Sequence, residues 1–130
     1  MTRTLSHLAE LQPELFCEVS PELASAIDLQ HGAFATITTP RGIVEARVMV
    51  TNRLKPLLVE GRSIHQIGIP FHFGTNGLVT GDSANDLLPI SEEPNVRIME
   101  AKALLCDITP GRRPRGKAAL EFLAKKMEAA

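Results

Sequence analysis

Nine glycines and nine prolines punctuate this chain of 130 residues. Proline lacks a backbone donor and ends helices, and glycine supplies the backbone conformations that tight turns need. The stretches between them are therefore read as short elements joined by turns. Trp and Tyr are absent, so any aromatic contact to a ligand must come from the five Phe residues.

The clearest of these elements is a hairpin within residues 33–51. Residues 34–39 are rich in β-branched side chains, and Pro40-Arg41-Gly42 suits a type I turn. In the strand after the turn, apolar and charged side chains alternate, which predicts one buried and one solvated face. The buried face would hold Val44, Ala46, Val48 and Val50, and the solvated face Glu45 and Arg47.

The rest of the chain reads as further short strands and helices around one long loop. Residues 71–95 carry little strand signal apart from 78–80, and we expect them to form an ordered, functional loop. An amphipathic helix should begin at Lys117. The other expected elements are helices at 5–11 and 21–29 and strands at 15–19, 57–59, 64–69 and 102–108.

The charges nearly cancel, since 14 Lys and Arg accompany 15 Asp and Glu for a formal net charge of -1. Domains that bind nucleic acid or anionic membranes usually present strongly basic surfaces, so neither partner is expected. No apolar run approaches the roughly 20 residues that span a bilayer, and the first residues lack the apolar stretch of a signal peptide. We expect a soluble chain with no membrane insertion and no export signal of its own.

Charge is uneven along the chain. Residues 1–30 carry one positive and five negative side chains, whereas residues 110–130 carry six positive and two negative ones. Either both segments are solvated, or the basic tail docks on an acidic surface. The cluster Arg112-Arg113-Pro114-Arg115 has no interleaved aromatic residue, which favours a protein partner over nucleic acid.

Few side chains suggest chemistry. Cys17 and Cys106 lie far apart in apolar stretches and are expected to be free, buried thiols. His72 is the best-placed histidine, because it follows Pro70 where a strand meets the long loop, and it would serve either a ligand or the loop backbone. No phosphate-loop, zinc-protease or serine-hydrolase motif is present, so we predict no catalytic residue and no metal ligand.

Several segments, taken in order, resemble one family. They are residues 8–16, the Pro40-Arg41-Gly42 hairpin, and residues 52–57, 67–74, 84–89 and 100–103. Together they resemble the C-terminal molybdopterin-dinucleotide-binding domain of the large (alpha) subunit of formate dehydrogenases, in the molybdopterin oxidoreductase family. The resemblance covers residues 2–116.

The resemblance implies a mainly β fold, a double-psi β-barrel with short helices and a C-terminal helix. Residues 1–116 would form the molybdopterin-dinucleotide-binding barrel, and residues 117–130 an amphipathic helix appended to it. The cofactor would be bis-molybdopterin guanine dinucleotide, with Mo or W held by the rest of an enzyme that oxidises formate to CO2. The isolated chain would lack the redox centres and the cofactor, and would not be active alone.

The implied partners are the remaining domains of the large subunit and its iron-sulfur subunit. Surfaces built for those neighbours favour self-association of an isolated domain. The compartment would be the cytoplasm by default, or the periplasm with the parent enzyme. The alternative is a stand-alone double-psi barrel that acts as a protein-interaction or regulatory module.

The resemblance also implies cofactor-binding residues at matching positions. An opening polar segment would approach the cofactor, and its arginine would suit a phosphate. A histidine and a glycine would lie beside the pterin, an asparagine would face a pterin or guanine edge, and a lysine would neutralise a phosphate or pterin oxygen. A Phe stands at position 73, where the family commonly has Trp. The residues concerned are Arg3, Thr4, Ser6, His72, Gly74, Asn85 and Lys102. The binding hypothesis predicts that polar residues of the N-terminal segment, His72 and Asn85 converge on one open cleft. The alternative predicts that these residues scatter and that a continuous apolar or basic contact face is present instead.

Overall fold

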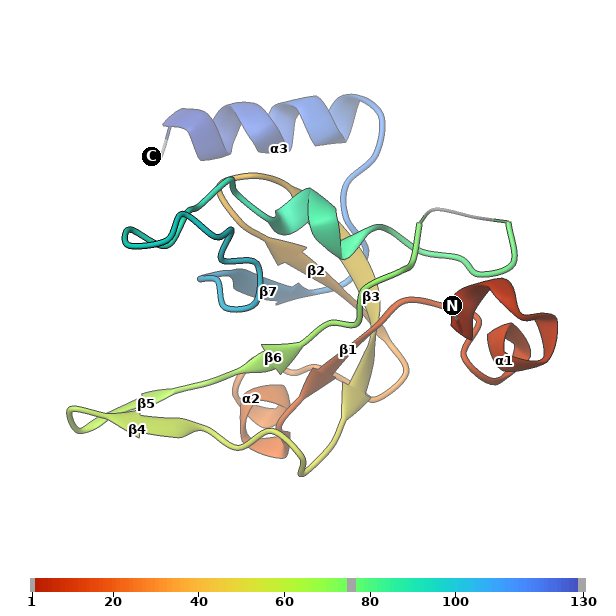
Figure 1. Cartoon of the computed structure of the whole chain (residues 1–130), viewed down its shortest axis with the longest axis horizontal. Coiled ribbons are helices and arrows are strands. Elements are labelled where there is room, and N and C mark those ends of the chain that lie inside the picture. Colours follow the sequence, from red (N-terminus) through yellow and green to blue (C-terminus); the bar gives the residue numbers. More distant parts are fainter. Residues whose placement is uncertain (1, 75–76, 129–130) are drawn as a thin grey trace.

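A computed structural model describes residues 2–74 and 77–128 and shows short strands with a few short helices (Figure 1). The predicted mainly β class is confirmed. In chain order the elements are η1 (Thr2–Thr4), α1 (Ser6–Leu11), β1 (Phe16–Val19), α2 (Pro21–Ala26), β2 (Phe34–Thr38), β3 (Ile43–Val50), β4 (Leu57–Val59), β5 (Arg62–Ile64), β6 (Ile67–Gly68), η2 (Ala84–Leu87), β7 (Asp107–Pro110) and α3 (Lys117–Glu128).

Five strands form one curled sheet in the order β6-β1-β3-β2-β7 (Figure 1). β1 runs parallel to β3, and the other pairs are antiparallel. β4 and β5 pair only with each other and project from the body as an arm, here residues 57–64. The closure and crossing connections specific to a double-psi barrel stay a prediction. Within the described residues, no helix is long and apolar enough to cross a bilayer.

The hairpin is confirmed, and it supplies the centre of the core. Thr38 faces Ile43 across β2 and β3, and the Thr39 amide donates to the Gly42 carbonyl oxygen at 2.9 Å. The apolar side of β3 points inward as the alternation predicts. Val44, Ala46 and Val48 are buried, and Val50 is half-buried.

The predicted solvated face of β3 is wrong at Glu45, whose exposed fraction is only 7%. Residues 111–115, which we call the strap, cross this face of the strand and bring arginine side chains onto the carboxylate. Glu45 is therefore buried by an ionic contact from a segment about 67 positions later in the chain.

Other elements differ from the prediction in length, and the strand predicted at 64–69 is divided between β5 and β6, which belong to different sheets. The Ser20 hydroxyl accepts from the Leu23 amide at 3.1 Å and starts α2, which ends at Ala26. The predicted strand at 102–108 pairs with β2 only from Asp107 onward, and Lys102, Leu104 and Cys106 before it line a groove. α3 begins at Lys117, and the last two residues of the predicted 117–130 helix lie outside the described residues.

The long loop is held against the start of β1. We call residues 77–88 the site loop. Its Thr80 amide donates to the Pro13 carbonyl oxygen at 2.7 Å, and the Leu15 amide donates to the Thr80 carbonyl oxygen at 3.0 Å. Gly81 has φ +118°, and a Cβ there would lie 2.5 Å from the Leu15 Cβ. The loop thus needs a glycine where it touches the strand.

We predict that Gly81→Ala destabilises the chain by about 2 kcal/mol or more, because the methyl group meets both a steric conflict and an unfavourable backbone angle. Gly77→Ala is the matched control in the same loop, since a Cβ at Gly77 meets nothing within 4 Å. Urea denaturation measures both variants. Equal midpoints for Gly81→Ala and Gly77→Ala would show that the loop does not pack on β1 as described.

Candidate functional site

The side chain of Arg3, which belongs to η1, packs against the turn that carries His72. Its Cζ sits 4.4 Å from the ring centroid of Phe73, and its Nη1 donates to the Gln12 carbonyl oxygen at 3.4 Å. Phe73 has an exposed fraction of 0%, so the ring forms a rigid base for the guanidinium. The same burial leaves Phe73 unable to stack on a ligand.

His72 and Gly74 flank Phe73 in left-handed backbone conformations, with φ of 74° and 76°. His72 is exposed, and a non-glycine residue at this φ is held there by its surroundings at some cost. Gly74 permits a close approach, because a Cβ there would lie 2.9 Å from the Ser83 amide nitrogen. The turn 72–74 therefore packs directly on the start of η2.

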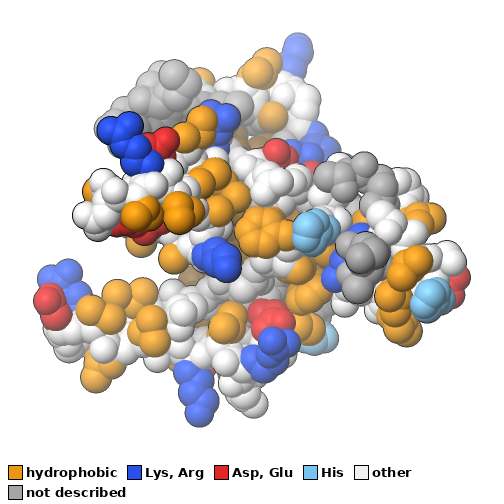
Figure 2. Space-filling model, in the orientation of Figure 1, with side chains coloured by type: hydrophobic (Ala, Val, Ile, Leu, Met, Phe, Trp, Pro, Cys, Tyr) orange, Lys and Arg blue, Asp and Glu red, His pale blue; other side chains and the backbone are white. Residues whose placement is uncertain are grey.

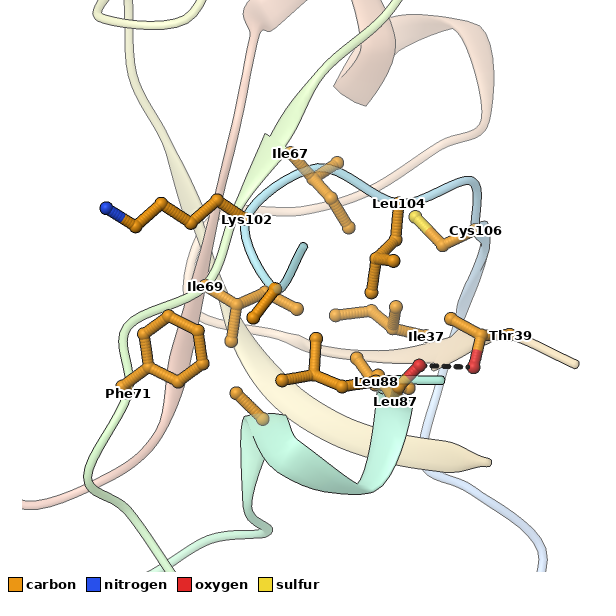
Figure 3. Close-up of a pocket in the computed structure, with 12 residues that line it drawn as sticks. Ile37, Thr39, Ile67, Ile69, Phe71, Leu87, Leu88, Lys102, Leu104 and Cys106 are labelled. Carbon is orange, nitrogen blue, oxygen red and sulfur yellow. Dashed lines mark hydrogen bonds between the residues drawn. The ribbon is translucent and has the colours of Figure 1, made fainter. Parts of the chain in front are cut away.

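Asn85 is presented by η2. The Ser83 hydroxyl accepts from the Asn85 amide at 3.3 Å and starts the helix. Ala84 and Leu87 are buried, while Asn85 is exposed on the other side. The Thr39 hydroxyl donates to the Leu87 carbonyl oxygen at 2.8 Å, so the hairpin turn holds the far end of η2 (Figure 3).

Lys102 lies at the edge of an apolar groove of about 130 Å³. Figure 3 shows its amine pointing away from the apolar side chains that fill the view. Lys102 shares this groove with Phe71, which precedes His72, and with Ala84 of η2. The other lining residues are Ile37, Thr39, Ile67, Ile69, Leu87, Leu88, Ala101, Leu104 and Cys106.

Five of the seven predicted site residues lie on segments that adjoin one another. Arg3 packs on Phe73, Gly74 lies against Ser83, and Lys102 lines the same groove as Phe71 and Ala84. His72 and Asn85 belong to the same two segments, the turn and η2. Thr4 ends η1 and Ser6 begins α1, and both are exposed beside Arg3 in the chain.

A family model described as "Molydopterin dinucleotide binding domain" matches residues 1–105. The chain belongs to this family. It is 38% identical over 113 residues to the formate dehydrogenase subunit alpha of Megalodesulfovibrio gigas, which covers 84% of this chain and 11% of that protein. It is 41% identical over 98 residues to the nitrate-inducible formate dehydrogenase major subunit of Escherichia coli, covering 75% of this chain and 10% of that protein.

An F420-dependent formate dehydrogenase 1 subunit alpha of Methanococcus maripaludis is 29% identical over 102 residues, covering 78% of this chain. The chain spans about a tenth of the length of the first two relatives, as their covered shares of 11% and 10% show. The family assignment therefore describes a domain, and the matched region is only a small part of each of these relatives.

Beside this domain's predicted site lies an ionic cluster that the sequence reasoning missed. Glu45 Oε1 accepts from Arg112 Nη2 at 2.7 Å and from Arg115 Nη2 at 2.6 Å, and Oε2 accepts from the Arg113 amide at 3.2 Å. Arg113 Nη2 donates to Asp82 Oδ1 at 2.9 Å. Three arginines of the basic tail are therefore paired within the domain. The sequence left two interpretations of the basic tail, a solvated segment or one that docks on an acidic surface. For these three arginines the second interpretation holds, and the acidic groups are Glu45 and Asp82.

Opposing effects act on the pKa of Glu45. Burial raises this pKa, and it is the largest single effect. The hydrogen bond from Arg112, the charges of Arg112 and Arg115, and the Arg113 amide lower the pKa, and together they outweigh the effect of burial. The net pKa is lower than the ordinary value of 4.5. A depressed folded pKa stabilises the fold above the unfolded pKa, and this stabilisation is lost as pH falls through the folded value.

The cysteines differ from each other. Cys17 is buried, and burial raises the pKa of its thiol to about 12. Cys106 is exposed and lines the groove, so its predicted burial is wrong; the stretch before β7 runs along the surface. Among the described residues, no group of three His, Cys, Asp or Glu side chains could hold a metal ion.

We predict that Glu45→Gln lowers the free energy of unfolding by about 2 kcal/mol at pH 7, because a neutral amide loses the charge-assisted hydrogen bonds. Because the folded pKa is lowered, the stabilisation from the carboxylate begins to be lost as pH falls below the ordinary value of 4.5, so the gap between variant and wild type should be smaller at pH 3 than at pH 7. Urea denaturation at both pH values measures this. If the difference in unfolding free energy between Glu45→Gln and wild type stayed constant with pH, the charged Glu45 carboxylate would not be the stabilising group.

Proposed function

We propose that this chain is the C-terminal cofactor-binding domain of a molybdenum or tungsten formate dehydrogenase large subunit. Residues 1–116 form the binding domain, with double-psi connectivity, and residues 117–130 an appended helix. The observation that carries the proposal is that Arg3 packs on the turn 72–74, that this turn lies against the start of η2, and that Lys102 lines the groove beside both segments. The similar proteins named formate dehydrogenase add the substrate, formate.

The side chains suit a guanine dinucleotide that carries a pterin. Arg3 offers a guanidinium to a phosphate, with its plane set by Phe73. The Lys102 amine points outward from the groove and provides a second cation for a phosphate or a pterin oxygen. Asn85 donates and accepts, as the edge of a pterin or guanine requires, and His72 lies beside the pterin. Thr4 and Ser6 add hydroxyl groups near Arg3.

The size of the groove indicates that this domain forms one wall of the site. Sites that enclose a drug-sized ligand occupy about 300 Å³ or more. The groove measures about 130 Å³, which is too small to enclose a dinucleotide cofactor. The remaining domains of the large subunit would complete the site. The metal of the bound cofactor supplies the redox chemistry that converts formate to CO2, and the residues of this chain bind and orient the cofactor.

The arm supports docking to those remaining domains, or to the iron-sulfur subunit. Leu57, Leu58, Val59 and Ile64 are all exposed on it. Figure 2 shows hydrophobic side chains on this projection and on the part of the body that faces it across a hollow. Apolar side chains on a projecting hairpin favour a protein partner, because their burial is the main gain on association.

We predict that the chain binds guanosine diphosphate, which stands for the nucleotide half of the cofactor, and that Arg3→Gln weakens binding about tenfold. Arg53→Gln is the matched control, because Arg53 is an exposed arginine paired only with Glu18 among the contacts described. Isothermal titration with guanosine diphosphate and with molybdopterin guanine dinucleotide measures the effect, and thermal melting checks the folding. Absence of binding to both ligands, or equal weakening in the two variants, would contradict the proposal.

We predict that the isolated chain self-associates through the arm, and that Leu58→Asp reduces this association. Leu58 is 79% exposed, so the change should not disturb folding. Leu11→Asp in α1 is the control, because Leu11 is 80% exposed and lies on the opposite side of the molecule from the arm. Analytical ultracentrifugation over a range of concentrations measures the association. If both variants reduced self-association equally, the chain would not self-associate through the arm.

A further inference from the structure

The strap (residues 111–115) is fixed to the sheet at its first residue. The Gly111 amide donates to the Phe34 carbonyl oxygen at 2.8 Å, and the Thr36 hydroxyl donates to the Gly111 carbonyl oxygen at 3.0 Å. Gly111 has φ +98°, which lets the chain turn from β7 across the sheet. The strap lies after the residues 1–105 that the family model matches.

The strap then reaches both carboxylates of the ionic cluster. Arg112 and Arg115 hold Glu45, as described above, and the Arg112 Cζ also lies 4.1 Å from the ring centroid of Phe34. Arg113 alone crosses to the site loop, where its Nη2 bonds Asp82. Its Nε is buried without a hydrogen-bond partner among the described residues, and its Nη2 is paired with Asp82.

Asp82 joins the strap to the sheet. Its Oδ1 accepts from Arg113 and its Oδ2 accepts from the Glu45 amide at 2.9 Å, so one carboxylate bridges the strap and β3. The side chain of Asp82 is mostly buried, and so is that of Glu45. Pairs that share buried carboxylates in a network resist solvent screening better than an isolated surface pair.

Asp82 lies between two residues of the site loop that contact neighbouring segments. Gly81 before it packs on Leu15, and Ser83 after it starts η2 and contacts Gly74. Movement of Asp82 would therefore shift both segments that carry predicted ligand-binding side chains, the turn 72–74 and the helix that presents Asn85.

We propose that the strap is a clamp that positions the site loop, and that Arg113 is the positioning residue that acts through Asp82. The clamp orders the loop in the isolated chain whatever it binds. Its effect on cofactor affinity rests on the proposed function. The strap thus couples a segment outside the family-model match to the binding surface of the domain.

Hydrogen exchange by mass spectrometry on the full chain tests the clamp. In Arg113→Gln, exchange should rise about tenfold in peptides covering residues 80–88, rise also at the Glu45 amide that Asp82 accepts from, and stay unchanged in β1 and α2. Arg113→Lys should restore part of the protection, because a lysine keeps the charge near Asp82. Arg53→Gln is the matched control, since it also removes one arginine from one carboxylate, and it should leave residues 80–88 unchanged.

Guanosine diphosphate titration supplies the second readout, in which Arg113→Gln should weaken binding about fivefold. Unchanged exchange at residues 80–88, or a uniform rise over the whole chain, would overturn the clamp. Increased local exchange with unchanged affinity would overturn its role in binding. Wild-type chain that binds no guanosine diphosphate would count against the proposed function, while the exchange data would still decide whether the clamp exists.

Discussion

Two carboxylates, Glu45 and Asp82, join three parts of the chain that are distant in sequence. Glu45 belongs to the central hairpin, Asp82 to the site loop, and the arginines to the strap. A largely buried carboxylate is costly without partners, so each part of this cluster depends on the others. The loop has few strand hydrogen bonds, and this cluster is one of the contacts that replace them.

The segments that carry the proposed binding residues adjoin this cluster. Asp82 lies directly before Ser83, which starts η2 and lies against Gly74, and the Thr39 hydroxyl donates to the Leu87 carbonyl oxygen at the far end of η2. The groove measures only about 130 Å³, and the arm exposes apolar side chains to solvent. Both features suit a domain that covers a ligand together with other domains.

Local patterns predicted most of the elements, because hairpin alternation, capping residues and helical spacing act over a few residues. The 34–50 hairpin, the cap at Ser20 and the start of α3 at Lys117 are examples. The alternation failed at Glu45, because its partners come from the strap and no local pattern reports a contact across that separation. Cys106 was misplaced for a related reason, since an apolar stretch can border a surface groove as well as fill a core.

His72 was nominated by its place before the long loop, but the other site residues came from the resemblance, since no spacing rule connects Arg3 with positions 85 and 102. The most direct test of the account is nuclear magnetic resonance of the labelled chain titrated with guanosine diphosphate. The account predicts amide shifts concentrated at Arg3, residues 72–74 and residues 83–86. Shifts confined to the arm, or spread without relation to these residues, would contradict it.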